Sequence, residues 1–178
     1  MVFVIFLAQC AILMTVALLW AKWSELDLAF SAPAFRKSEP WILLFILWCT
    51  ALWALSSFLP IEVDPGSGER MDQLSLGEDL VVSVVLGPLS EELVFRGAMF
   101  ASLLRRWGIW AAVLVPSLIW GLLHVQYEWW LVAAISGMGA LLAMTRWRSG
   151  SLYVPVGLHA AWNFLVTLDD HGLLRFMA

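Results

Sequence analysis

Residues 80–97 read LVVSVVLGPLSEELVFRG, an apolar run that carries two carboxylates and one guanidinium near its centre. A helix needs about 20 mostly apolar residues to cross a membrane, and this run approaches that length. A charged side chain at the centre of a bilayer costs at least about 2.5 kcal/mol, so residues of this kind are candidates for function. The first candidate site residues are therefore Glu91, Glu92 and Arg96.

The composition of the whole chain is that of a membrane protein. Of its 178 residues, 62% are hydrophobic and 13% are charged, against about 45–50% and about 25% in ordinary soluble domains. Because a core of this size cannot bury so much apolar surface, the excess must face lipid. The net charge of −4 and the lack of a basic patch argue against a nucleic-acid partner.

Six apolar segments are long enough to span a bilayer, and they should be helices because backbone groups in lipid must pair within the segment. They are Val2–Trp20, Trp41–Leu59, Leu80–Leu104, Trp107–Val125, Trp129–Thr145 and Leu152–Leu168. The polar stretch Ile61–Glu78 is expected to be an exposed loop. We therefore expect an all-α, polytopic integral membrane bundle of about six helices, with residues 1–178 in a single membrane domain.

The basic residues predict the orientation of this bundle. Alternate connections between the segments hold Lys22, Arg36, Lys37, Arg105, Arg106, Arg146 and Arg148. The opposite side holds Arg70 and Arg175. Because cytoplasmic loops are enriched in Lys and Arg, both termini are predicted to lie outside the cytoplasm.

Helix geometry separates the two adjacent glutamates. Glu91 and Glu92 lie about 100° apart on a helix, so they cannot share one face. Glu92 and Arg96 are four residues apart and can pair on one side. We therefore assign the Glu92–Arg96 pair a mainly structural role and Glu91 the chemistry. The alternative is that all three residues form one ion-pair network that holds helices together.

Three more polar residues lie in the apolar segments. His124 is near the end of the fourth segment, and His159 and Asn163 share one face of the sixth because they are four residues apart. A lone histidine on an apolar face is usually an interhelical hydrogen-bond partner. Together with Glu91, however, these residues supply a proton acceptor, a second titratable group and hydrogen-bond donors. That inventory suits hydrolysis by an activated water.

Three motifs resemble those of the CPBP family, whose name joins CAAX proteases and bacteriocin-processing enzymes and which is also called Abi. They are Glu91-Glu92-Leu93-Val94-Phe95-Arg96 for EExxxR, Trp120-Gly121-Leu122-Leu123-His124 for FxxxH with Trp in place of Phe, and His159-Ala160-Ala161-Trp162-Asn163 for HxxxN. The motifs come in this order, each on its own predicted helix. The resemblance implies a catalytic four-helix core over residues 79–168, with residues 1–78 as two accessory helices and a polar loop.

The family consists of intramembrane glutamic endopeptidases, so the resemblance implies roles for single residues. Glu91 and His124 would hold and activate a water, and His159 and Asn163 would form the oxyanion site. The implied supporting residues are Glu92, Arg96 and Trp120. The resemblance also implies no cofactor, a peptide or protein substrate at the lipid bilayer, and a place in the membrane of a bacterial or archaeal cell. For so short a chain we expect an exported protein with a C-terminal sorting tag, or a peptide leader, as substrate.

Three other interpretations remain open from the residues alone. Two histidines and a glutamate can hold a zinc ion with one open position, which would make a zinc-dependent membrane peptidase. Intramembrane Glu and His also build the proton relays of transporters, although no inverted repeat is visible between the two halves of the chain. The third interpretation is a scaffold or immunity factor that has the fold without catalysis.

Overall fold

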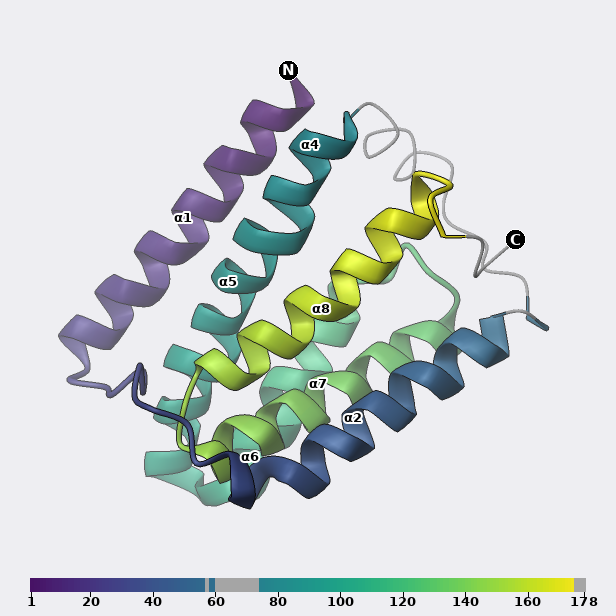
Figure 1. Ribbon diagram of the computed structural model, residues 1–178. Coiled ribbons are helices and arrows are strands. Elements are labelled where there is room, and N and C mark those ends of the chain that lie inside the picture. Colours follow the sequence, from purple (N-terminus) through teal and green to yellow (C-terminus); the bar gives the residue numbers. More distant parts are fainter. Residues whose placement is uncertain (57, 60–73, 175–178) are drawn as a thin grey trace.

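The computed structural model describes residues 1–56, 58–59 and 74–174, and all regular structure in these ranges is helical (Figure 1). The elements are α1 (Val2–Trp23), α2 (Phe35–Ser56), α4 (Leu76–Asp79), η1 (Leu80–Leu86), α5 (Gly87–Glu92), η2 (Leu93–Met99), α6 (Phe100–Leu122), α7 (Trp129–Ser149) and α8 (Tyr153–Asp170), where η marks a π-helical stretch. The predicted all-α fold is confirmed. Most of the predicted loop Ile61–Glu78 lies outside the described residues.

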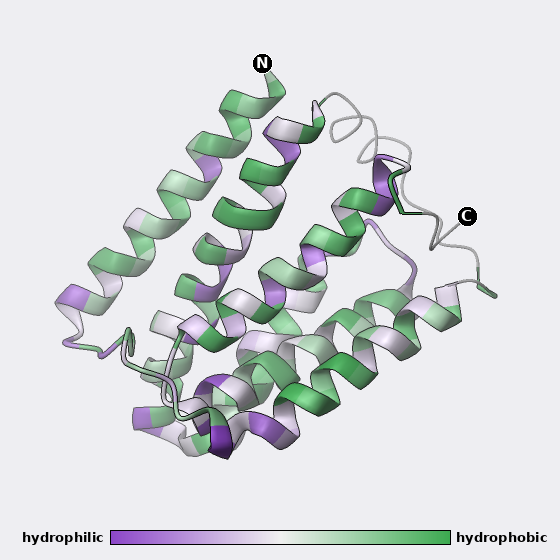
Figure 2. Ribbon diagram, viewed as in Figure 1, coloured by the Kyte–Doolittle hydropathy of each residue, from purple (hydrophilic) through white to green (hydrophobic). Residues whose placement is uncertain are grey.

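Within the described residues, four helices are long and apolar enough to cross a membrane: Val2–Trp23, Phe35–Ser56, the continuous run Leu76–Leu122, and Trp129–Ser149. Figure 2 shows hydrophobic residues along the outer helices α1 and α2. The predicted number of six spans is not confirmed. Helix α8 is not among the four, and its polar residues His159 and Asn163 and the aspartates at its end lower its hydropathy.

The run Leu76–Leu122 contains two predicted segments, and the chain reverses between them at Gly108. This glycine has φ 80° and ψ −174°, a backbone conformation that other residues rarely adopt. After the reversal, Ala112 and Val113 pack in one buried cluster with Phe100 and Leu103. The third and fourth predicted segments are therefore antiparallel neighbours, as their short connection predicts.

Two predicted boundaries are corrected by local hydrogen bonds. The Ser75 hydroxyl accepts from the Glu78 backbone N–H at 3.4 Å, and the Glu78 carboxylate accepts from the Ser75 N–H at 3.0 Å. This capping box starts the helix at Leu76 instead of Leu80. At the other end of the run, α6 ends at Leu122, so His124 lies in the following turn, where its N–H bonds to the Gly121 carbonyl.

Helix α8 packs against α5, and α6 packs against η2. Helix α2 packs on α7, α7 packs on α6, and α8 packs on η1 and α7. Helix α1 lies beside α5 and η2 (Figure 1). The basic connections gather at one end of the bundle, where the Arg105 guanidinium donates to the Ser24 carbonyl at 3.0 Å and the Ala34 N–H to the Ser149 carbonyl at 2.9 Å.

Candidate active site

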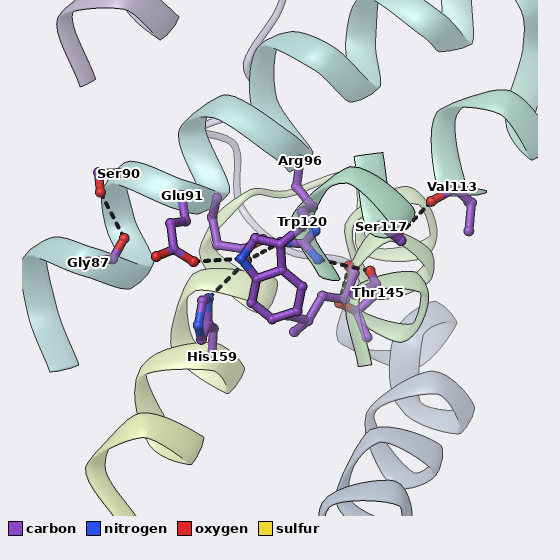
Figure 3. Close-up of polar contacts among 12 residues, drawn as sticks. Gly87, Ser90, Glu91, Arg96, Val113, Ser117, Trp120, Thr145 and His159 are labelled. Atoms are coloured by element: carbon purple, nitrogen blue, oxygen red, sulfur yellow. Dashed lines mark hydrogen bonds and ion pairs between the residues drawn. The ribbon is translucent and has the colours of Figure 1, made fainter. Parts of the chain in front are cut away.

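The candidate acid Glu91 is held by the indole of Trp120. The Trp120 Nε1–H donates to Glu91 Oε2 at 2.6 Å, which joins α5 to α6 across the reversal (Figure 3). The Trp120 side chain is 2% exposed, while Glu91 is half-buried. A hydrogen bond to an ionised acceptor is shorter and stronger than a neutral one. The second oxygen of the Glu91 carboxylate remains able to accept from a water.

Both intramembrane histidines pack edge-on against the same indole. The ring centroid of Trp120 lies 5.3 Å from that of His124 and 5.2 Å from that of His159, with nearly perpendicular planes. These rings come from the turn after α6 and from α8. The structure therefore brings Glu91, His124 and His159 together around one aromatic side chain.

The hydrogen bonds at Nδ1 fix the proton positions on both histidines. His124 Nδ1 lies 2.8 Å from the carbonyl oxygen of Trp120, and a carbonyl only accepts, so this nitrogen carries the proton. His159 Nδ1 lies 3.0 Å from Glu92 Oε1. A carboxylate oxygen also accepts, so this Nδ1 carries the proton as well. In the neutral rings, Nε2 is then an acceptor. A second proton at His159 would place a positive charge beside the Glu92 carboxylate.

Glu92 and Arg96 form the ion pair that helix spacing predicts. Arg96 donates to Glu92 Oε1 at 2.6 Å, and both side chains are fully buried. Arg96 also donates to the Gly139 carbonyl of α7 at 3.1 Å and stacks over the Trp120 ring at 4.6 Å. Glu91 is hydrogen-bonded to Trp120, and the ion pair recorded for Arg96 among the described residues is with Glu92. The alternative in which all three charged residues form one network that holds helices together stays open.

Asn163 has a partner that the sequence analysis did not predict. Its Nδ2 donates to the backbone carbonyl of Ser83 in η1 at 2.8 Å. Asn163 lies one helical turn from His159 on α8, as expected, and this bond ties its amide to η1, the stretch that precedes Glu91 and Glu92 in the same continuous run. One N–H of the amide is thus engaged, and the other remains for a ligand.

A further polar cluster lies beyond Asn163, toward the end of α8. The Ser83 hydroxyl donates to the buried carboxylate of Asp79, and His171 Nε2 lies 3.1 Å from the other Asp79 oxygen. The spacing of four between Asp79 and Ser83 was a signal for their contact, whereas the position of His171 depends on the docking of α8.

Two features of the site come from residues with no charge. The expected role of Trp120 was that of a supporting aromatic residue, and the structure adds a hydrogen-bond donor that phenylalanine lacks. Gly139 is the second feature: a Cβ there would lie 2.9 Å from Arg96 and 3.0 Å from Trp120. The sequence gives no signal for this contact, because α7 contains two glycines, Gly137 and Gly139, and nothing in the sequence distinguishes them.

Among the described residues, no group of three or more His, Cys, Asp or Glu side chains is arranged to hold a metal ion. The zinc-dependent alternative therefore stays a prediction for a chelation experiment.

A bundle of apolar helices with an acid, two imidazoles and an ion pair gathered inside it defines a polytopic integral membrane protein with a buried polar site. Residues 75–165 match the family described as type II CAAX prenyl endopeptidase Rce1-like. Because the match covers just over half of the chain and contains every candidate site residue, the chain belongs to this family. The resemblance drawn from the three motifs is confirmed.

Two curated relatives each align with about half of the chain. One is the "Putative membrane peptidase YdiL" of Bacillus subtilis (strain 168), 29% identical over 89 residues, which are 50% of this chain and 36% of the relative. The other is an "Uncharacterized 24.3 kDa protein" of Escherichia coli, 37% identical over 83 residues, which are 45% of this chain and 38% of the relative. The alignments thus span less than half of either relative. No solved structure matches the chain.

Proposed function

We propose that this protein is an intramembrane glutamic endopeptidase in which Glu91 activates a water. The observation that carries the proposal is the convergence of the Glu91 carboxylate and two imidazoles on the Trp120 indole. Titratable groups gathered in a poorly solvated site are the usual arrangement of acid–base catalysts. Membership of the Rce1-like family supports peptide-bond hydrolysis as the reaction.

In the proposed reaction, a water bound between Glu91 and His124 Nε2 attacks the carbonyl carbon of the substrate. Glu91 takes a proton from the water as the oxygen–carbon bond forms. The tetrahedral intermediate then collapses, the carbon–nitrogen bond breaks, and Glu91 returns the proton to the leaving amine. The reaction consumes one water and needs no cofactor.

His159 and Asn163 are proposed to meet the negative oxygen of the intermediate. His159 can donate from Nε2 when its ring is doubly protonated, and the Glu92 carboxylate at 3.0 Å stabilises that charge. Asn163 has a second amide N–H besides the one given to Ser83. Removal of one oxyanion donor lowers kcat by on the order of 10²–10³ in other hydrolases. Glu92 and Arg96 hold this half of the site in place.

The proposed substrate is a peptide or protein at the membrane. The family description names a CAAX prenyl endopeptidase, and C-terminal sorting tags and leader peptides are the other substrates that we consider. We test all three as internally quenched fluorescent peptides: a farnesylated CAAX peptide, a tagged transmembrane segment and a leader peptide, each with the full chain in proteoliposomes.

The decisive comparison is wild type against Glu91→Gln, His124→Ala and His159→Ala, with the exposed Glu39→Gln as the matched control. We expect cleavage by the wild type and the control only. Wild-type rates in the three site variants would refute the proposed site, and a wild type that cleaves none of the peptides would favour a scaffold or a transporter. Loss of both activity and stoichiometric zinc after treatment with a chelator would instead support the zinc peptidase.

We further propose that both termini lie outside the cytoplasm of a bacterial or archaeal cell. The basic residues gathered at one end of the bundle support this orientation, because positive loops are retained in the cytoplasm. Single cysteines in place of Arg106 and Glu78 can be labelled in intact cells with an impermeant maleimide. We expect reaction at position 78 and protection at position 106, and the reverse pattern would overturn the orientation.

A further inference from the structure

The carbonyl group of Ser83 lies where the helix backbone supplies no donor. In the π-helical stretch η1, the N–H of Gly87 bonds to the Val82 carbonyl, five residues back. In the same register, the N–H of residue 88 would bond to Ser83, but residue 88 is proline and has no N–H. The Gly87–Pro88 step therefore removes both backbone donors that the Ser83 oxygen would otherwise have.

Glycine at position 87 makes this register possible. A Cβ at Gly87 would lie 2.9 Å from the Val82 carbonyl oxygen, closer than real Cβ atoms approach. A larger residue would push the backbone away from Val82 and disturb the π-register. π-helical stretches of this kind are rare and occur often at functional sites. Gly87 and Pro88 thus act together to leave one carbonyl open within an apolar helix.

Asn163 supplies the missing donor from another helix. Its Nδ2 lies 2.8 Å from the Ser83 oxygen and takes the place of the missing backbone donor. The Ser83 hydroxyl is held in turn by the buried Asp79 carboxylate, which His171 also contacts. Two polar ties, at Asn163 and at His171, therefore fix α8 against the start of the run that carries Glu91.

We propose that Pro88 is a positioning residue for Asn163: by leaving the Ser83 carbonyl without a backbone partner, it fixes the amide that faces the oxyanion. The catalytic part of this inference, that Asn163 faces the oxyanion, rests on the proposed function. Its structural part, the link between Pro88 and Asn163 through Ser83, is independent of any activity. Substitution of Pro88 by alanine restores a backbone donor in either helical register, from residue 88 in the π-register or from Gly87 in the α-register, and frees Asn163.

A double-mutant cycle on stability tests the link. The full chain is unfolded in mixed micelles as wild type, Asn163→Ala, Pro88→Ala and the double variant. In the wild-type background, loss of Asn163 leaves the Ser83 carbonyl without a hydrogen-bond donor. The ratio of folded to unfolded protein should therefore fall by about tenfold or more. In the Pro88→Ala background, the same loss should change the ratio by less than about threefold, because residue 88 or 87 now supplies the donor. Equal effects of Asn163→Ala in both backgrounds would overturn the inference, whatever the enzyme does.

The catalytic part is tested with the peptide that the wild type cleaves. We expect Pro88→Ala to lower kcat by on the order of tenfold with KM unchanged, because the oxyanion donor is no longer held in place. Pro40→Ala is the matched control, since Pro40 also lies inside a helix but on the accessory helix α2. An unchanged kcat in Pro88→Ala would refute the positioning role. Failure of the proposed function itself appears separately, as wild-type cleavage by Glu91→Gln.

Discussion

The indole N–H of Trp120 and the carboxylate of Glu91 are 2.6 Å apart, although 29 residues separate them in the chain. This bond joins the helical segment before the reversal at Gly108 to the segment after it, and it fixes the orientation of the carboxylate. Because both imidazoles and the Arg96 guanidinium also pack on the indole, Trp120 connects the proposed base to the rest of the site.

Substitution Trp120→Phe keeps an aromatic ring and removes the donor. We expect kcat to fall by about tenfold or more, because a charge-assisted hydrogen bond contributes about 1.5–3 kcal/mol and Glu91 would lose its orientation. Peptide cleavage in proteoliposomes measures the effect. Trp110→Phe is the control, since Trp110 is 69% exposed. Equal rates for the two variants would mean that the N–H does not serve the reaction.

Gly139→Ala tests the close packing of α7 against the site. Its Cβ would lie 2.9 Å from Arg96 Nη2 and 3.0 Å from the Trp120 ring, so a side chain must shift. Overpacking of this kind costs about 1–3 kcal/mol. Gly157→Ala is the matched control, because nothing lies within 4 Å of its added Cβ, and it should be neutral or stabilising by up to about 1 kcal/mol. Thermal unfolding in detergent compares the two; similar midpoints would contradict the packing described.

The buried Glu92–Arg96 pair predicts an asymmetric response to mutation. Removal of one partner alone, as in Arg96→Met, leaves an unpaired buried charge and should cost about 3–5 kcal/mol. The double variant Glu92→Leu with Arg96→Met should recover much of that loss, since no charge is left unpaired. Equilibrium unfolding in mixed micelles measures both. Additive losses in the double variant would show that the pair is not the source of the effect.

Tyr127 predicts an alkaline limit to stability. Burial, followed by the negative charge of Asp170, raises the pKa of the Tyr127 phenol. The unfolded chain therefore releases this proton near the ordinary value of about 10, while the folded protein keeps it. The stability from neutral Tyr127 is full below about pH 10 and is lost as pH rises through the folded pKa.

Alkaline unfolding midpoints test the prediction for Tyr127. We expect the loss of stability above about pH 10 to be shallower in Tyr127→Phe than in the wild type. Tyr153→Phe is the control, because Tyr153 is 56% exposed, and in that variant Tyr127 is the single tyrosine of the chain, so absorbance follows its titration directly. A Tyr127 that titrates at the ordinary pH in the folded protein would refute the expectation.

Local rules predicted much of this protein because they act over one or two helical turns. Apolar composition forces helices in lipid, and the spacing of four predicted the Glu92–Arg96 pair. The three motifs indicated which polar residues belong together. The start of the helix at Leu76 was also readable from the capping box at Ser75 and Glu78, a signal that the interpretation of residues 61–78 as a loop missed.

Tertiary structure alone decided which partners meet across helices. The reversal at Gly108 brings Trp120 to Glu91, and the docking of α8 brings His159 to Glu92 and Asn163 to Ser83. No spacing along one helix contains these contacts, because they depend on how the helices rotate and slide against one another. The sequence by itself determined that buried polar groups exist and must find partners, and packing determined which partners they found.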